Sequence, residues 1–222
     1  MEQPKEMPAE RKFQDKKRYL WAFIIGTAAF ILVFLISNGI SFLEFQRISS
    51  IQDTFAYKMF EDKLYSSFFN QSVCGDESLD KVSQDLGFQG KIIDDLEKKF
   101  GKDSEQVLQR KKFYTLVEIE HFEFVQLRIK NCRLSKNTIL FFYSNKEKDI
   151  TRSEEIGRLL NEVYLKNEDN LLIYSFDINL ESDLIENLME KYDVTESPTL
   201  IINSNSTVTE PIRIENVENH LF

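Results

Sequence analysis

The sequence predicts an α/β domain at the end of a membrane-anchored chain, with a region of long helices between the anchor and that domain. Three observations lead to this prediction. An uncharged, apolar run covers residues 19–43. Residues 44–130 contain no proline and keep their apolar side chains at helical spacing. From Asn137 onward, short apolar runs typical of buried strands alternate with amphipathic helices.

The apolar run is long enough to cross a bilayer, because a hydrocarbon core of roughly 30 Å takes about 20 residues of helix. Tyr19 and Trp21 stand where interfacial aromatic side chains are common. A cleaved signal peptide and a buried apolar helix are the competing interpretations, but the apolar core of a signal peptide is shorter and ends in small residues. We therefore expect residues 19–43 to form an uncleaved signal-anchor, a single transmembrane helix.

The charges on either side of this segment predict its orientation. Five basic residues lie between Arg11 and Arg18, whereas Glu44 and a lone Arg47 follow the apolar run. Since basic residues favour the cytoplasmic side, residues 1–18 are expected to be a cytoplasmic tail, with the rest outside the cytoplasm at the cell membrane. Beyond residue 18 the chain holds 22 basic and 33 acidic residues, and this negative balance argues against a nucleic-acid partner.

Residues 44–132 are expected to be a helical region. The first helix continues from the membrane over residues 44–68, and the second covers Leu79–Phe100. In the second helix the apolar spacing resembles a coiled-coil seam, with Gln89 at one core position. Gly87 and Gly90 weaken this helix by roughly 1 kcal/mol each and allow a kink there.

The second and third helices are expected to form an antiparallel hairpin that closes at Gly101. This glycine follows two lysines, a common signal for a helix end. Asp103 and Gln106 resemble a capping box that opens the third helix, which would run to about Asn131.

The two cysteines, Cys74 and Cys132, flank this hairpin and should meet at the same end of it. An exported location permits a disulfide, which would stabilise the fold by roughly 4 kcal/mol in the chain-entropy model. Two free buried thiols and a redox-active pair are the alternatives. His121 and His220 have no neighbours at metal-ligand spacing, so we expect neither a metal site nor a cofactor.

The C-terminal part, residues 137–222, is expected to contain four strands and three helices in the order β-α-β-α-β-β-α. A turn at residues 203–206 joins the last two strands. The expected strands are 139–143, 171–176, 199–203 and 208–214, and the expected helices are 153–165, 183–192 and 215–222.

This order, with Pro198 opening the third strand, resembles the thioredoxin superfamily. The run Tyr192-Asp193-Val194 before Ser197-Pro198-Thr199 is similar to the family's cis-proline segment, and Asp177 matches another common family position. The resemblance implies a thioredoxin-like α/β domain with a cis Ser197–Pro198 bond, lying beside the loop at residues 144–153. In active members this loop carries Cys-x-x-Cys, but here it contains no cysteine.

The expected function is therefore binding without redox catalysis, and no catalytic residue is assigned. Ser197, Pro198 and Thr199 are the candidate groove for a protein or peptide partner, which would add a strand beside the proline. One alternative is a membrane-bound thiol–disulfide oxidoreductase that uses Cys74 and Cys132 or a partner's cysteines. Another is a structural spacer or a protein that forms homo-oligomers through the helical region.

Overall fold

The computed structural model describes residues 17–37, 57, 60, 74, 77–209 and 211–221. The chain divides into two compact units, Met1–Ser50 and Ile51–Phe222. The described residues form six helices and one four-stranded sheet, so the chain is a mixed α/β protein. The cytoplasmic tail predicted for residues 1–18 lies outside the described residues except at its last two positions. The helix predicted over residues 44–68 also lies outside them, apart from Tyr57 and Phe60.

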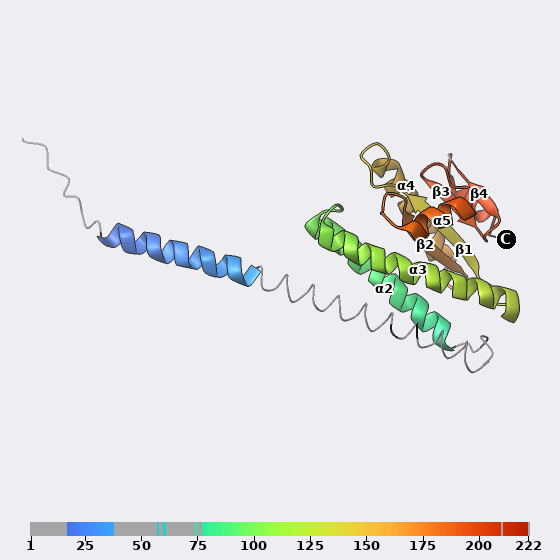
Figure 1. The fold of residues 1–222 in the computed structure, drawn as a ribbon, viewed down its shortest axis with the longest axis horizontal. Coiled ribbons are helices and arrows are strands. Elements are labelled where there is room, and N and C mark those ends of the chain that lie inside the picture. The colour runs from blue at the N-terminus through green and yellow to red at the C-terminus, as the bar shows by residue number, and fades with distance from the viewer. Residues whose placement is uncertain are drawn as a thin grey trace, which may run out of the picture. The chain divides into compact units, whose positions relative to one another are not determined.

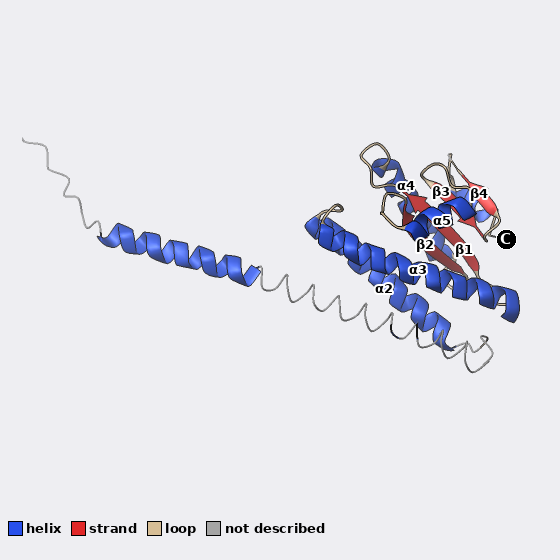
Figure 2. Ribbon diagram, viewed as in Figure 1, coloured by secondary structure: helices blue, strands red, loops and turns tan. Residues whose placement is uncertain are grey.

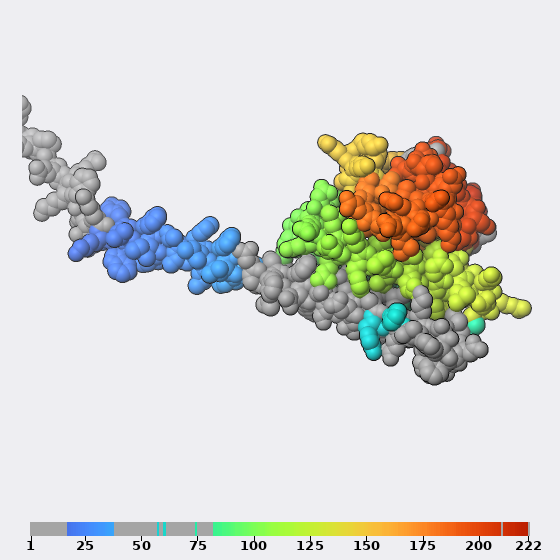
Figure 3. Space-filling model, in the orientation of Figure 1, coloured from blue at the N-terminus to red at the C-terminus, as the bar shows by residue number. Residues whose placement is uncertain are grey.

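The first unit contains the helix Lys17–Ser37, in which an 18-residue stretch has a mean hydropathy of 2.5. Its side chains are exposed, and none of the apolar stretch is buried (Figure 3). A bilayer could cover these side chains, since the helix is long and apolar enough to span one. This helix could therefore serve as a membrane anchor.

The second unit is built around a sheet with strand order β2-β1-β3-β4 (Figure 1). Strand β1 pairs with β2 in parallel and with β3 antiparallel, and β3 pairs with β4 antiparallel. The elements follow one another as α2 (Glu77–Phe100), α3 (Glu105–Cys132), β1 (Asn137–Tyr143), α4 (Ile150–Lys166), β2 (Leu171–Asp177), α5 (Asp183–Lys191), β3 (Thr199–Ile202), β4 (Ser206–Val208) and α6 (Ile214–Glu218).

Helices cover both faces of the sheet (Figure 2). Because side chains alternate along a strand, Leu140 and Phe142 of β1 pack in the core with α2, α3 and α5. Ile139 and Phe141 pack on the opposite face with α4 and α6. Helix α5 lies beside α3 on the first face (Figure 3), where Lys191 forms an ion pair with Glu123 at 3.1 Å.

The helical hairpin closes as the sequence predicts. Helix α2 ends at Phe100, and Gly101 follows with a positive φ of 88°, a backbone conformation that glycine adopts without a steric penalty. The capping box predicted at Asp103 is wrong, because the N-cap is Ser104 and its side chain makes no capping hydrogen bond. Helix α2 continues through both of its internal glycines.

Gly90 lies where the two hairpin helices approach closely. A Cβ atom at this position would lie 2.7 Å from the Tyr114 hydroxyl oxygen, whereas one at Gly87 would have nothing within 4 Å. Glycine at residue 90 therefore allows Tyr114 to pack against α2. Although the apolar spacing of α2 resembles a coiled-coil seam, its residues Val82 and Leu86 belong to the same core as strand residues Leu140 and Phe142.

The predicted strand at residues 208–214 is wrong in position and length. Strand β4 covers only Ser206–Val208. Pro211 cannot donate a ladder hydrogen bond, which disfavours a strand continuing through it. The preceding turn is tight because Asn203 and Ser204 both adopt positive φ, at 51° and 61°.

Candidate functional site

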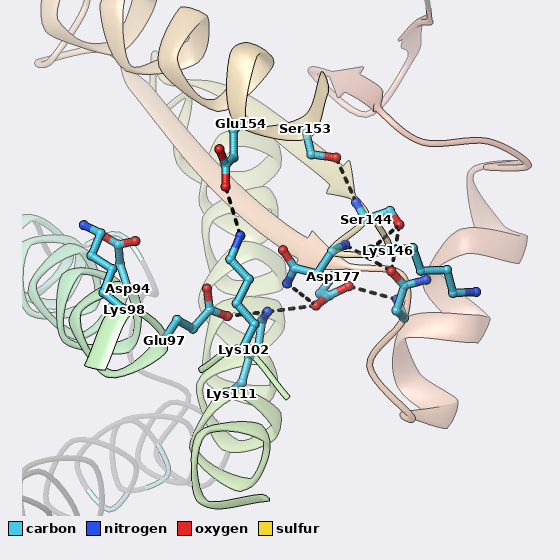
Figure 4. A network of polar contacts seen from close by, with 12 residues as sticks. Asp94, Glu97, Lys98, Lys102, Lys111, Ser144, Lys146, Ser153, Glu154 and Asp177 are labelled. Atoms are coloured by element: carbon cyan, nitrogen blue, oxygen red, sulfur yellow. Dashed lines mark hydrogen bonds and ion pairs between the residues drawn. The ribbon is translucent and has the colours of Figure 1, made fainter. Parts of the chain in front are cut away.

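The main cluster of buried charged side chains lies where the parallel strands β1 and β2 end (Figure 4). Lys111 of α3 is buried, and its ammonium donates to two carboxylates. Its Nζ lies 2.7 Å from Glu97 Oε1 on α2 and 2.8 Å from Asp177 Oδ2 at the end of β2. One lysine therefore joins both helices of the hairpin to the sheet.

Asp177 is also held by the two loops that follow the strands. Asn145 Nδ2 donates to its Oδ2 at 2.7 Å, and the Asn179 N–H donates to its Oδ1 at 3.0 Å. Each carboxylate oxygen of Asp177 thus has at least one hydrogen-bond donor. These hydrogen bonds matter because burying a carboxylate without partners is energetically very unfavourable.

Lys111 stays charged in this environment. Burial opposes its charge, but Tyr143, Asp177 and Glu97 outweigh burial and raise the pKa of the Lys111 ammonium above its usual value. The ammonium also lies 5.1 Å from the centre of the Tyr143 ring, in a cation–π contact. A lysine that stays protonated is not a nucleophile, so the cluster does not support covalent amine chemistry.

The loop after β1 is closed by its own polar side chains and by Asn179 from the loop after β2. The Ser144 Oγ lies 3.0 Å from Asp149 Oδ2 and 2.8 Å from Asn179 Oδ1, and the Ser144 N–H donates to Ser153 Oγ at 3.1 Å. Ser144 is fully buried. The loop after β1 is therefore a hydrogen-bonded turn of serine, asparagine and aspartate.

The predicted groove residues lie at the start of β3, and the Ser197–Pro198 bond is cis, as predicted. Thr199 pairs with Phe142 of β1, which places the proline segment beside the start of the loop at residues 144–153. Pro198 and Thr199 are buried, and Ser197 is half-buried. The preceding Thr195 and Glu196 are exposed, so the accessible part of this segment lies before the proline.

Cys74 and Cys132 form a disulfide with Cα atoms 5.4 Å apart, which confirms the predicted pairing. Lys111 and Cys132 are 21 residues apart on α3, or about 30 Å at a rise of about 1.5 Å per residue. The disulfide is thus far from the cluster around Lys111. It also lies near the start of β1, whereas Thr199 is paired near the end of that strand.

A cleft of about 350 Å³ runs along the free edge of β2, between that strand, the hairpin and the start of α4. Its lining includes Glu97, Lys111 and the deeply buried Glu118 of α3. Burial raises the pKa of the Glu118 carboxyl to about 8, against the opposing effects of the Ser175 N–H, the Tyr114 hydroxyl and Lys111. A carboxyl group with this pKa could donate or accept a proton near neutral pH.

The two histidines have different surroundings. His121 is buried, with Nδ1 2.8 Å from the Tyr174 hydroxyl and Nε2 3.2 Å from Ser83 Oγ, and burial lowers its pKa to about 4. His220 is exposed near the C-terminus, with Nδ1 2.6 Å from the Asn216 carbonyl oxygen. Within the described ranges, no three His, Cys, Asp or Glu side chains are grouped so that they could hold a metal ion.

Sequence reasoning singled out Asp177 but missed Lys111 and Glu118. The signal lies in α3, where one series of buried positions, 107, 111, 115, 118, 122 and 125, recurs every three or four residues. Lys111 and Glu118 occupy two of these positions between Val107 and Phe122. Charged residues on an otherwise buried helix face predict partners on a neighbouring element, although they do not identify those partners.

No protein-family model and no curated protein matches the chain.

Proposed function

We propose that this chain is a membrane-anchored, redox-inactive thioredoxin-fold module that binds a protein or peptide partner outside the cytoplasm. The fold assignment is supported by the β2-β1-β3-β4 order, in which only β1 and β2 are parallel, and by a proline at the start of β3. Helices α4 and α6 on one face and α5 on the other give further support. In the proposed topology, the N-terminus is cytoplasmic and the helix Lys17–Ser37 spans the membrane.

The observation that carries the binding proposal is the open backbone before β3. The N–H groups of Thr195, Glu196 and Ser197 make no backbone hydrogen bond with any described residue. Thr195 and Glu196 are exposed, and the segment lies beside the end of β1. Backbone N–H groups without a partner, in an exposed segment that leads into a strand, can pair with an extended peptide.

The loop after β1 explains why the proposed activity is binding and not exchange. Thiol–disulfide exchange requires a thiolate that attacks a disulfide sulfur. The loop supplies hydroxyl, amide and carboxylate groups from Ser144, Asn145 and Asp149, none of which can do this chemistry. Both cysteines of the chain are joined at the other end of the sheet, which gives the oxidoreductase alternative less support.

The proposal can be tested by selecting displayed peptides against the full chain in lipid nanodiscs and mapping the selected peptides by amide NMR shifts. We expect shifts that centre on residues 195–199. Glu196→Lys should weaken or abolish binding, whereas Glu162→Lys, at an exposed position of α4, should not. Shifts confined to another face, or equal effects of the two variants, would contradict the proposed groove.

A further inference from the structure

The cleft at the edge of β2 has an acidic side chain at its base. Glu118 is 2% exposed, and its Oε1 accepts a hydrogen bond from the Ser175 N–H at 3.0 Å. Glu118 is one of the residues that line the cleft, and its Oε2 is buried and makes no hydrogen bond with any described group. The Tyr114 hydroxyl is close enough to favour the ionised form of Glu118, yet it does not complete a hydrogen bond with Oε2. A buried acceptor without a partner is costly, and a ligand donor could satisfy it.

The charges around the cleft favour a cationic ligand. Two lysines line it, and both are already bound to carboxylates: Lys102 to Glu154 at 3.1 Å, and Lys111 to Glu97 and Asp177. The lining carboxyl groups therefore outnumber the lining ammonium groups. An anion would meet these carboxylates without gaining an uncommitted ammonium group from the lining, whereas a cation would find acceptors.

The apolar and aromatic residues that line the cleft favour an organic cation over a metal ion. Ile93, Ile173 and Phe141 supply apolar surface, and Tyr114 and Tyr143 supply aromatic rings. Such walls suit an alkyl chain that ends in an ammonium group, because aromatic rings attract cations and apolar surface covers the chain. A metal ion fits less well, since the described residues contain no group of three potential ligands among His, Cys, Asp and Glu.

The cleft also opens to solvent and is large enough for such a group. The Asp94 and Glu154 side chains that line it are 58% and 54% exposed, so the site can be reached from the surface. Its volume of about 350 Å³ lies within the range of small-ligand pockets.

We propose that this cleft binds the primary ammonium group of an alkylamine, with Glu118 Oε2 as its acceptor at the base of the site. The ammonium can belong to a free amine or to the lysine side chain of a partner. The cleft shares no residue with the proposed peptide groove at residues 195–199, so either assignment can fail without the other.

Binding at this site should depend on pH through Glu118. The titratable groups that interact with this carboxyl are Lys111 and Tyr114 from α3 and Tyr174 from β2. Tyr143 from β1, Glu97 from α2 and Glu154 from α4 line the same cleft. The pKa values of Lys111 and the three tyrosines are raised above their usual values, so these groups do not titrate near neutral pH. Because the pKa of Glu118 is about 8, a bound ammonium ion would favour the ionised form of the Glu118 carboxyl group. The proton of that carboxyl group would be released to solvent.

The experiment uses the full chain in lipid nanodiscs, with the isoleucine methyl groups labelled for NMR. n-Butylammonium and a peptide with one central lysine are titrated separately. We expect both to shift the methyl signals of Ile93 and Ile173, with affinity for each rising by about tenfold between pH 6.5 and pH 8. Tighter binding of the peptide would identify a partner's lysine as the source, and equal or tighter binding of butylammonium would identify a free amine.

The variant Glu118→Gln keeps an oxygen for the Ser175 N–H but loses the ionisable group. It should bind both probes at least about tenfold more weakly and without the rise above pH 7. Glu123→Gln, on an exposed position of the same helix, is the matched control and should bind like the wild type. The proposal is overturned if neither probe shifts Ile93 and Ile173, if Glu118→Gln binds equally well, or if butyrate shifts the same methyl groups more strongly.

Discussion

Lys111 and Asp177 are 66 residues apart in the chain, yet Lys111 Nζ lies 2.8 Å from Asp177 Oδ2 in the interior. This ion pair connects the helical hairpin to the end of β2. The same ammonium also lies 2.7 Å from Glu97 Oε1 on α2. The hairpin is therefore bound to the sheet by charge as well as by the apolar core that the two share.

Removing this lysine should strongly destabilise the second unit. Lys111→Ala would leave Asp177 and Glu97 buried without their ammonium partner, and we expect a loss of about 3–5 kcal/mol in the free energy of unfolding. Lys112→Ala is the control, because its ion pair with Glu181 spans 3.9 Å at the surface and should contribute less than about 1 kcal/mol. Urea unfolding of both variants checks this, and equal midpoints would contradict a central role for Lys111.

The two internal glycines of α2 should respond oppositely to alanine. Gly87→Ala should stabilise the protein by up to about 1 kcal/mol, because alanine favours a helix and the new methyl group meets no other atom. Gly90→Ala should destabilise it by about 1–3 kcal/mol, because the methyl group would overlap the Tyr114 hydroxyl. Thermal unfolding measures both effects.

A double variant isolates the cause of the Gly90 effect. Adding Tyr114→Phe to Gly90→Ala removes the hydroxyl oxygen that the new methyl group meets, so part of the lost stability should return. If the two substitutions are simply additive, the close approach of Gly90 and Tyr114 is not the reason for the glycine.

His121 should make the protein less stable in acid. Its folded-state pKa of about 4 lies below the usual value of about 6.5, so the unfolded chain binds a proton that the folded chain does not. Stability from this group is complete above about pH 6.5 and falls as the pH drops toward 4, by about 3 kcal/mol in total. The variant His121→Gln should lack this contribution in urea unfolding measured across the same window. An unchanged pH slope would show that the imidazole does not titrate as proposed.

The cysteines should support stability and not exchange. Replacing Cys74 and Cys132 by serine should cost about 4 kcal/mol, since the disulfide closes a loop with a sequence separation of 58 residues. The purified wild-type chain should reduce a model disulfide no faster than the thiol reductant alone. Turnover well above that background, lost in the double serine variant, would show that the hairpin cysteines carry redox chemistry.

The basic residues before the N-terminal helix predict its orientation. In intact cells or spheroplasts, added protease should remove epitopes placed beyond residue 44 and spare an epitope on the N-terminal tail. A C-terminal epitope that resists the protease, and is cleaved only after lysis, would contradict the proposed topology.

Much of the local structure was predictable from the sequence, because local structure follows from neighbouring residues. Apolar spacing identified α2 and α3, Gly101 marked the turn between them, and the hairpin placed Cys74 beside Cys132. The order of strands and helices from residue 137 also followed from periodicity and turn composition. Errors arose at element ends, as in β4, where Pro211 and two left-handed residues outweighed an apolar run.

By itself, the sequence determined the mixed α/β class, the apolar N-terminal helix and the absence of a thiol after β1, and it predicted the disulfide that the structure contains. Only the tertiary structure decided that Lys111 meets Asp177, that Gly90 makes room for Tyr114, and that Glu118 lies at the base of a cleft. The physical reason is that periodicity specifies which helix face is buried but not which residues lie opposite it. A buried charge needs a partner, and the packing of helices on a sheet determines which residue that partner is.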